Sequence, residues 1–306
     1  MIAACLIAAH LTTGSFGTRP ATVSGAEPVG VAARGGLFES ASSKQRREAV
    51  AAFPLDRLTP EARDRILRIA ESPTIYRKLP TQSIQCDRDM FLFLTRNPEV
   101  LVGLWDLMGV TNVTVRRTER YKLDAQDGNG TTCEIDLIYG DSEMHVFVAR
   151  GSYDGKLTTK PILGDGVFLI RSDYAEDVGS GTTVTGTLDC FVKFDGFGAD
   201  LVARTLSGLI GKSADNNFVE TARFISQISQ ASETNPAGMI DVARRLPQVE
   251  MPTKKQFAGA ILTVAKRSGV GFEEMARRAA TGHAARARLD AVPPGTAPSG
   301  TTPSLR

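Results

Sequence analysis

The sequence predicts an α+β fold in which an antiparallel β-sheet wraps around a long C-terminal helix. Two observations predict it. Between residues 111 and 195, apolar and polar residues alternate in runs separated by short turns, which is typical of β-strands. Residues 198–232 then carry apolar side chains at steps of three and four without a proline, which is typical of an amphipathic helix. Because a one-sided sheet and a one-sided helix each need a partner, we expect them to pack on one another.

The start of the chain resembles a secretory signal peptide over residues 1–26. An apolar run from Met1 to Leu11 is followed by Ser24 and Ala26, small residues of the kind found at cleavage sites. The run is shorter than the ~20 residues that span a bilayer, and no basic residue precedes it. We expect an exported protein, periplasmic or extracellular, if this leader is a signal peptide, and a cytoplasmic one otherwise. Residues 27–58 are expected to form a linker.

The main domain is expected over residues 59–234. Thr59 followed by Pro60 predicts the start of a helix. A short strand is expected at Leu79–Cys86, and Asp87 is expected to cap the helix that follows. A second short helix is expected from Asn97-Pro98-Glu99 onward.

The strand region is expected to fold as an antiparallel meander of about six strands. The run Asp127-Gly128-Asn129-Gly130 predicts a hairpin turn, because these residues tolerate positive φ. The following apolar face is expected to hold Cys133, Ile135, Leu137 and Tyr139. Since His145 alternates away from Met144 and Val146, we expect it at the surface or at a sheet edge.

Residues 237–290 are expected to form a helical appendage, and residues 291–306 a disordered tail rich in Pro, Gly, Ser and Thr. Within the appendage we expect Lys254–Ser268 to pack and the segment beyond Gly282 to fray. Lys and Arg exceed Asp and Glu by about five between residues 254 and 290. This charge would support a weak contact with an acidic membrane surface; an ordinary solvated face is the alternative.

Composition and motifs indicate no catalytic centre. A net charge of +2 gives no reason to expect nucleic acid as a partner. Gly208 to Ser213 resembles a phosphate loop, but Leu206 stands where the first glycine is required. His145 and His283 are far apart in the sequence. Cys86, Cys133 and Cys190 lack metal-site spacing and are expected to be small buried side chains. We therefore expect no catalytic residue, metal or cofactor.

Six residues are candidates for ligand binding. Arg117, Glu119 and Tyr121 follow Val113 and Val115 on one strand face, where they would be polar anchors among apolar walls. The alternative is that this strand protrudes beyond the core and leaves the charges in water. Further candidates on the strands and the long helix are Tyr139, Leu206 and Ile210.

The order of elements over residues 79–232 resembles the START-like helix-grip superfamily, which includes polyketide cyclases and lipid-transfer domains. That resemblance implies a sheet curled around the last helix, with a cavity for lipids, sterols or aromatic polyketides. It implies non-enzymatic binding or transport of a hydrophobic, lipid-like small molecule. Two alternatives stay open: a cyclase-, dehydratase- or hydrolase-type enzyme using the same cavity through Arg117, Glu119 and Tyr121 or nearby acids, and a structural module whose cavity is filled by its own side chains.

Overall fold

The computed structural model describes residues 35–155, 160–177, 181–195 and 199–269, with side chains from residue 43 onward except those of residues 177 and 199–212. The helices and strands are α2 (Gly35–Ala51), η1 (Leu55–Arg57), α3 (Pro60–Ala70), β1 (Ile75–Lys78), β2 (Gln82–Gln85), α4 (Arg88–Arg96), α5 (Pro98–Leu107), β3 (Thr114–Glu119), β4 (Lys122–Gln126), β5 (Thr131–Gly140), β6 (Met144–Tyr153), β7 (Ile162–Asp177), β8 (Gly181–Phe194), α6 (Ala199–Thr234), α7 (Pro236–Arg245) and α8 (Met251–Ser268).

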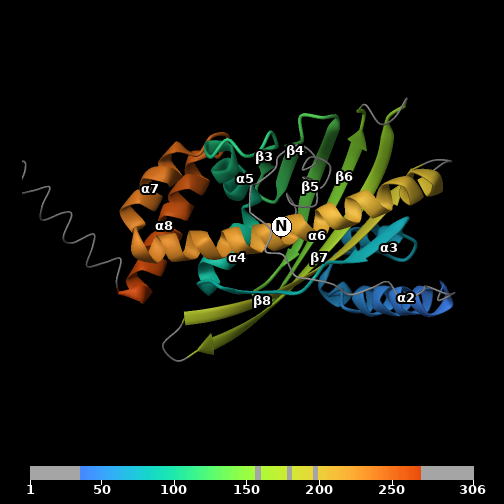
Figure 1. Cartoon of the computed structure of the whole chain (residues 1–306), viewed down its shortest axis with the longest axis horizontal. Helices are drawn as coiled ribbons and strands as arrows, with labels where there is room; N and C mark the ends of the chain where they lie inside the picture. The colour runs from blue at the N-terminus through green and yellow to red at the C-terminus, as the bar shows by residue number, and fades with distance from the viewer. Residues whose placement is uncertain (1–34, 156–159, 178–180, 196–198, 270–306) are drawn as a thin grey trace, which may run out of the picture.

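The fold is the predicted α+β arrangement, with an antiparallel sheet crossed by the long helix α6 (Figure 1). The strand order is β1-β8-β7-β6-β5-β4-β3, and β2 also pairs with β8. The sheet therefore has eight strands where about six were expected. The strand predicted at Leu79–Cys86 is the shorter β2, and the four-residue strand β1 just before it was not predicted.

The local signals in the sequence act as expected. The side chain of Thr59 accepts a hydrogen bond from the backbone N–H of Ala62 at the start of α3. Asp87 caps α4 by accepting from the N–H groups of Asp89 and Met90. α5 begins at the predicted Pro98. These contacts satisfy backbone donors that the first turn of a helix leaves unpaired.

The concave face of the sheet carries the main core. Side chains from α4, α5, α6 and α8 pack there on one another and on the strands. The deepest of them include Phe147 of β6, Leu188 of β8 and Phe218 of α6. This packing of sheet against long helix is the predicted one.

The convex face is also covered. The segment over residues 27–58, expected to be a linker, includes helix α2 and η1, and these lie with α3 against the back of the sheet (Figure 1). A second apolar cluster is formed there by Phe53, Ile66 and Ile69 with Val148 and Phe191 of the sheet. The sheet is therefore buried on both faces, which the alternation of apolar and polar residues did not indicate.

The appendage is a helix pair, α7 and α8, that packs on α6 and α4. In α8 the buried side chains include Phe257, Ile261 and Val264, so the predicted packing of Lys254–Ser268 is confirmed. The residues beyond 269, including Gly282 and the predicted tail, lie outside the described part of the chain, as does the expected leader over residues 1–26. Within the part of the chain that the structure describes, no helix is long and apolar enough to cross a membrane.

Candidate functional site

The concave face is packed differently under the two halves of helix α6. Under its C-terminal part, Phe218 and Ile225 meet Phe91 of α4 and Val184 of β8. The cavity left between them has a volume of about 10 Å³, which is room for a single water molecule. This half, called here the packed half, is therefore filled by the protein's own side chains.

The other half of the concave face is lined by small side chains. Pairing register brings Ala125, Cys133 and Gly151 into one row across β4, β5 and β6. A second row brings Ala149 of β6 opposite Gly166 of β7. We call these five residues the small-residue floor. None of these five residues has a side chain larger than that of cysteine, but the ring of Phe168 lies close to Gly166, and Ala149 pairs with the larger Ile135 on its other side.

Both halves are closed off from solvent. Cys133 and Ala149 keep 8% and 7% of their surface accessible, and Val184 and Leu188 in the packed half keep 0%. Ala125 of the floor keeps 4%, and Ala222, which lines the small cavity of the packed half, keeps 5%. The two halves therefore differ in the size of their side chains and not in their exposure.

An ion pair ties helix α6 to the β1 edge of the sheet. Arg77 of β1 donates from Nε to Oδ1 of Asp215 at 2.9 Å, and its Nη2 contacts the other carboxylate oxygen. Arg77 pairs in register with Cys190, so the contact joins the edge of the sheet to the helix. The pair is partly exposed and fixes position more than it adds stability.

The three described cysteines are buried, as expected, and no disulfide joins them. Burial raises the pKa of the Cys133 thiol to about 12 and that of Cys86 likewise to about 12. Both are therefore neutral thiols near pH 7 and weak nucleophiles. Among the residues that the structure describes, no group of His, Cys, Asp and Glu is placed to hold a metal ion.

Arg117, which was predicted to anchor a ligand, lies beside the turn that joins α4 to α5. Its guanidinium binds Glu99 through two hydrogen bonds, Nε to Oε1 at 2.7 Å and Nη2 to Oε2 at 2.9 Å. It also donates to the carbonyl of Arg96, the last residue of α4. Glu99 is almost fully buried, so Arg117 neutralises a carboxylate in the core and ties β3 to the turn between α4 and α5.

Glu119 and Tyr121 do not join Arg117 in one cavity. A β-bulge between Arg117 and Glu119 shifts the register, so the face predicted from alternation ends there. Glu119 forms an ion pair with Lys122, and Tyr121 is 52% exposed. Both point into solvent, which removes the acid–base groups that the enzyme alternative required.

Tyr139 lies on the opposite face from the one expected. A bulge between Leu137 and Tyr139 inserts one residue into β5 and turns Tyr139 toward the convex side. There its hydroxyl accepts a hydrogen bond from Arg57 at 2.9 Å and donates to Asp141 at 2.6 Å. Tyr139 therefore holds η1 against the sheet and is remote from the floor.

Leu206 and Ile210 belong to the first half of α6. Their side chains lie outside the described residues, so their part in ligand binding stays a prediction. Of the six predicted candidates, then, only these two fall on the element that runs over the concave face, and the floor itself was not singled out. The sequence does contain a signal for the floor. On one face of neighbouring strands, a small residue and a large one follow each other, as in Cys133 and Ile135 or in Ala149 and Phe147.

The position of His145 differs from the predicted one. It was expected at the surface or at an edge, yet it is completely buried on the concave side. Its Nε2 accepts a hydrogen bond from Nε of Arg96 at 3.0 Å. The error arose because Met144 and Val146 form an apolar face against the convex cover, so the face that looked exposed is the second buried one.

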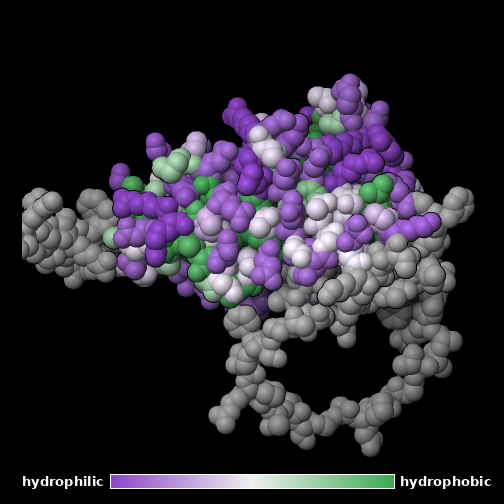
Figure 2. Space-filling view, turned by 90° about the horizontal axis from the view of Figure 1, so that it is seen from above, coloured by the Kyte–Doolittle hydropathy of each residue, from purple (hydrophilic) through white to green (hydrophobic). Residues whose placement is uncertain are grey.

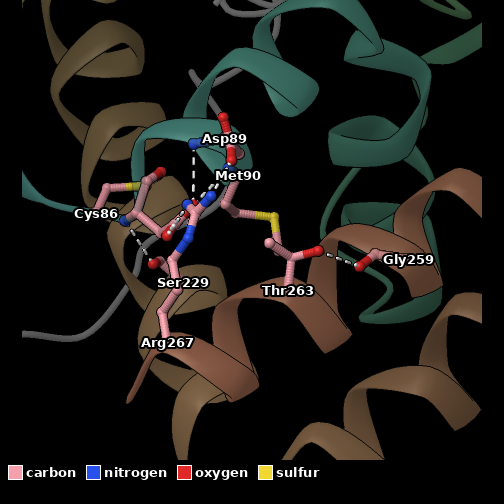
Figure 3. Close-up of polar contacts among 8 residues, drawn as sticks. Cys86, Asp89, Met90, Ser229, Gly259, Thr263 and Arg267 are labelled. Carbon is pink, nitrogen blue, oxygen red and sulfur yellow. Dashed lines mark hydrogen bonds and ion pairs between the residues drawn. The ribbon is translucent and has the colours of Figure 1, made fainter. Parts of the chain in front are cut away.

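Helix α8 closes the end of the packed half. Phe257 stacks on Phe93 of α4 with ring centroids 5.6 Å apart. Arg267 reaches from the last turn of α8 to Asp89 and the neighbouring Asp87 at the start of α4 (Figure 3). The cationic end of one helix thus meets carboxylates at the start of another.

On the face shown in Figure 2, hydrophobic residues lie in small groups separated by hydrophilic ones. Exposed large hydrophobic residues do occur, among them Leu107, Met108 and Val110 after α5. Scattered residues of this kind are normal for a protein surface.

Comparison with known proteins gives structural likeness and no match by sequence. No protein-family model and no curated protein matches the chain. Among solved structures, it is similar to a conserved protein from Geobacillus kaustophilus, with 10% identity over 50% of this chain and 96% of that chain and a TM-score of 0.38. It is similar to Ara h 8.0201, with 11% identity, 47% and 99% coverage, and a TM-score of 0.27.

A third similar structure is the di-domain ARO/CYC BexL from the BE-7585A biosynthetic pathway. It shares 16% identity over 61% of this chain and 59% of that chain, with a TM-score of 0.26. All three TM-scores are low, so the assignment of a helix-grip arrangement rests on the chain's own elements: short strands, two short helices, an antiparallel meander and a long helix.

Proposed function

We propose that the protein binds an apolar, lipid-like small molecule between the small-residue floor and the first half of α6. The observation that carries this proposal is the contrast along one face of one sheet. The packed half leaves a cavity of about 10 Å³, whereas the floor carries only the side chains of Ala, Cys and Gly. Concave, mostly apolar spaces of this kind are the usual places for small ligands.

The chemistry of the floor favours binding over catalysis. The side chains of the floor offer no charged group. The thiol of Cys133, which belongs to the floor, is neutral because burial raises its pKa to about 12. Of the groups proposed for the enzyme alternative, Arg117 is already bound to Glu99, and Glu119 and Tyr121 face solvent. In the packed half the protein's own side chains fill the cavity, as the structural-module alternative expects. The binding hypothesis and the structural-module hypothesis therefore differ in whether a ligand lies above the floor.

The START-like resemblance, export through the leader and weak membrane-surface contact of the basic C-terminal segment stand as further parts of this proposal. They are independent of one another. The floor is made of described residues, whereas the side chains of residues 199–212 on the first half of α6 lie outside them. Export rests on the sequence of residues 1–26 alone. Membrane contact rests on residues 254–290, of which 254–269 are described and Arg267 is already paired with Asp87 and Asp89.

The experiment is extraction of the purified protein under denaturing conditions, followed by mass spectrometry, with thermal shifts measured against fatty acids and sterols. We expect a co-purifying apolar molecule or a stabilising member of the panel, since a ligand that binds the folded state raises its stability. Absence of both would overturn the proposal and favour the filled-cavity alternative.

Two variants with the same chemical change locate the site. Ala149→Leu fills the floor and should weaken ligand binding by about 10-fold or more through steric exclusion. Ala70→Leu makes the same change in the core of α3 beneath the convex face, where Ala70 is fully buried. Both overpack the interior and should cost about 1–3 kcal/mol of stability, but Ala70→Leu should leave binding intact. Equal loss of binding in the two variants would place the ligand elsewhere.

A further inference from the structure

The joint between α4 and α5 is fastened to the sheet by two arginines. Arg117 of β3 holds the carbonyl of Arg96 and the buried carboxylate of Glu99. Arg96 itself donates from Nη2 to the carbonyl of Asp141 at 2.8 Å and from Nε to His145 of β6. The second fastening therefore consists of one bond to a backbone carbonyl and one bond to an imidazole that can gain a proton.

The hydrogen bond from Arg96 requires His145 to be neutral. An arginine N–H can only donate, so Nε2 of His145 must be the unprotonated nitrogen and Nδ1 must carry the hydrogen. Nδ1 is buried and has no hydrogen-bond partner among the described residues. Protonation at Nε2 would place one donor against another and remove the bond. It would also put two cations in contact at a site where the imidazole is closed off from solvent.

The groups that face His145 do not compensate for a second positive charge. On α4 the nearest charge is Arg96, and in the turn between β5 and β6 it is Asp141. The Asp141 carboxylate is already occupied by Tyr139 and by the N–H groups of Glu143 and Met144.

From β7, the pairing partner of His145 is Ile170, and Ser172 and Tyr174 follow on the same face. Burial raises the pKa of Tyr174 to about 12, so that its hydroxyl is neutral. The guanidinium of Arg88 lies over the Tyr174 ring, 4.6 Å from its centroid, and adds another cation on α4. On β5, the pairing partner of His145 is Gly140, which carries no charge.

We propose that His145 is an acid-sensitive fastening whose protonation releases the α4–α5 joint from the sheet and opens the concave side. The released element includes the helices that pack on the sheet beside α6, so the opening would expose the interior in which we place the ligand. The proposal stands on the Arg96–His145 contact and does not depend on the identity or presence of that ligand.

The direction and size of the effect follow from the protonation equilibrium. Burial, with the charge of Arg96, lowers the pKa of His145 from 6.5 to about 4. Because the folded pKa lies below the ordinary value, the open form binds a proton more readily than the closed form. The closed form therefore loses stability as pH falls below about 6.5. Between pH 7 and pH 5 the ratio of open to closed molecules should rise about 20-fold.

Amide hydrogen exchange at pH 7 and pH 5, corrected for intrinsic rates, measures this directly. We expect the protection factors of α4 and α5 to fall about 20-fold and those of β6 to β8 to fall much less. Trp105 is the only tryptophan and stacks on Phe224 of α6 with centroids 5.7 Å apart, so its fluorescence is a second reporter of α5 leaving α6. His145→Gln, whose side-chain oxygen still accepts from Arg96 but does not titrate, should abolish the pH effect. His283→Gln should keep it.

Three results would overturn the proposal: unchanged protection of α4 and α5 at pH 5, a pH effect that survives in His145→Gln, or an equal loss of protection in every element, which would indicate global unfolding. If His145→Gln does not fold, NMR titration of the histidine rings in the unaltered protein decides. A ring that titrates near 4 supports the fastening. Three rings that all titrate near 6.5 contradict it.

Discussion

The two faces of the sheet are covered by different parts of the chain and held by different chemistry. The concave face packs against the helices that surround or follow the strands, mostly through apolar side chains. The convex face packs against helices that precede the first strand, and polar contacts join them to it: Arg65 to Asp136, Arg57 to Tyr139, and Lys193 to the carbonyl of Arg68. Polar residues on these strands therefore mark the points where the cover docks.

A buried carboxylate bound by an arginine occurs on each side of the sheet. On the concave side Glu99 is bound by Arg117. On the convex side Asp189 is fully buried, bound by Arg171 at 2.9 Å and by the hydroxyl of Tyr76 at 2.7 Å. Charges of this kind are costly to bury unless paired. They are therefore sensitive points at which the two coverings can be tested against each other.

Removal of the convex cover should have the largest effect. Deletion of residues 1–72 takes away α2, η1 and α3 and exposes Val146, Val148, Val167, Leu169 and Phe191, which are buried in the intact chain. At 1.5–3 kcal/mol for each large apolar side chain, the loss should exceed about 5 kcal/mol. We expect an insoluble or unfolded product by circular dichroism. Deletion of residues 1–34 is the control and should leave folding intact; a stable, monomeric 73–306 chain would contradict the role given to the convex cover.

The buried pair on the concave side comes next. Arg117→Ala leaves Glu99 in the core without its cation and should cost about 4 kcal/mol in urea unfolding. The matched control is Arg116→Ala on the same strand, whose side chain is exposed and whose loss should change stability by about 0.5 kcal/mol or less. If both variants lost the same stability, Arg117 would not be acting through Glu99.

The corresponding change on the convex side should be smaller. Arg171→Ala removes the cation from Asp189, but the Tyr76 hydroxyl still donates to that carboxylate. We therefore expect a loss of about 3 kcal/mol. Double variants with Tyr76→Phe should show coupling, because both groups serve one carboxylate. Additive effects would mean that Asp189 does not depend on the two together.

The partly exposed ion pairs should contribute least. Arg65→Ala, which breaks the contact from α3 to Asp136, and Arg267→Ala, which breaks the contact from α8 to Asp87 and Asp89, should each cost about 1 kcal/mol or less. Both losses should shrink in 1 M salt because screening weakens exposed pairs. A cost of several kcal/mol at Arg65 alone would show that the convex cover is held by charge more than by its apolar cluster.

Sequence reasoning succeeded where the cause is local. Thr59 and Asp87 cap helices because a side-chain oxygen a few atoms away satisfies the first backbone donors, whatever the rest of the molecule does. The long helix and its packing on the sheet were likewise predicted, because apolar residues that recur with a period near 3.6 along such a long segment form a continuous stripe only on an α-helix. The candidate site was predicted only as a place, the concave face, and its lining was not.

Sequence reasoning failed where one inserted residue changes the face of the sheet to which the following side chains point. A bulge in β5 turned Tyr139 to the convex side, and a bulge in β3 separated Glu119 from Arg117. Alternation has a period of two residues, so one inserted residue exchanges the faces, and neither bulge has a glycine or proline to announce it.

By itself, then, the sequence determined the element order, the helix caps and the α+β class, since these depend on neighbours along the chain. Only the tertiary structure decided that α2 and α3 cover the back of the sheet, that His145 is buried against Arg96, and that small side chains gather on half of the concave face. The physical reason is that alternation shows that two faces of a strand differ, but burial depends on what packs on each face, and that is set by residues distant in the chain.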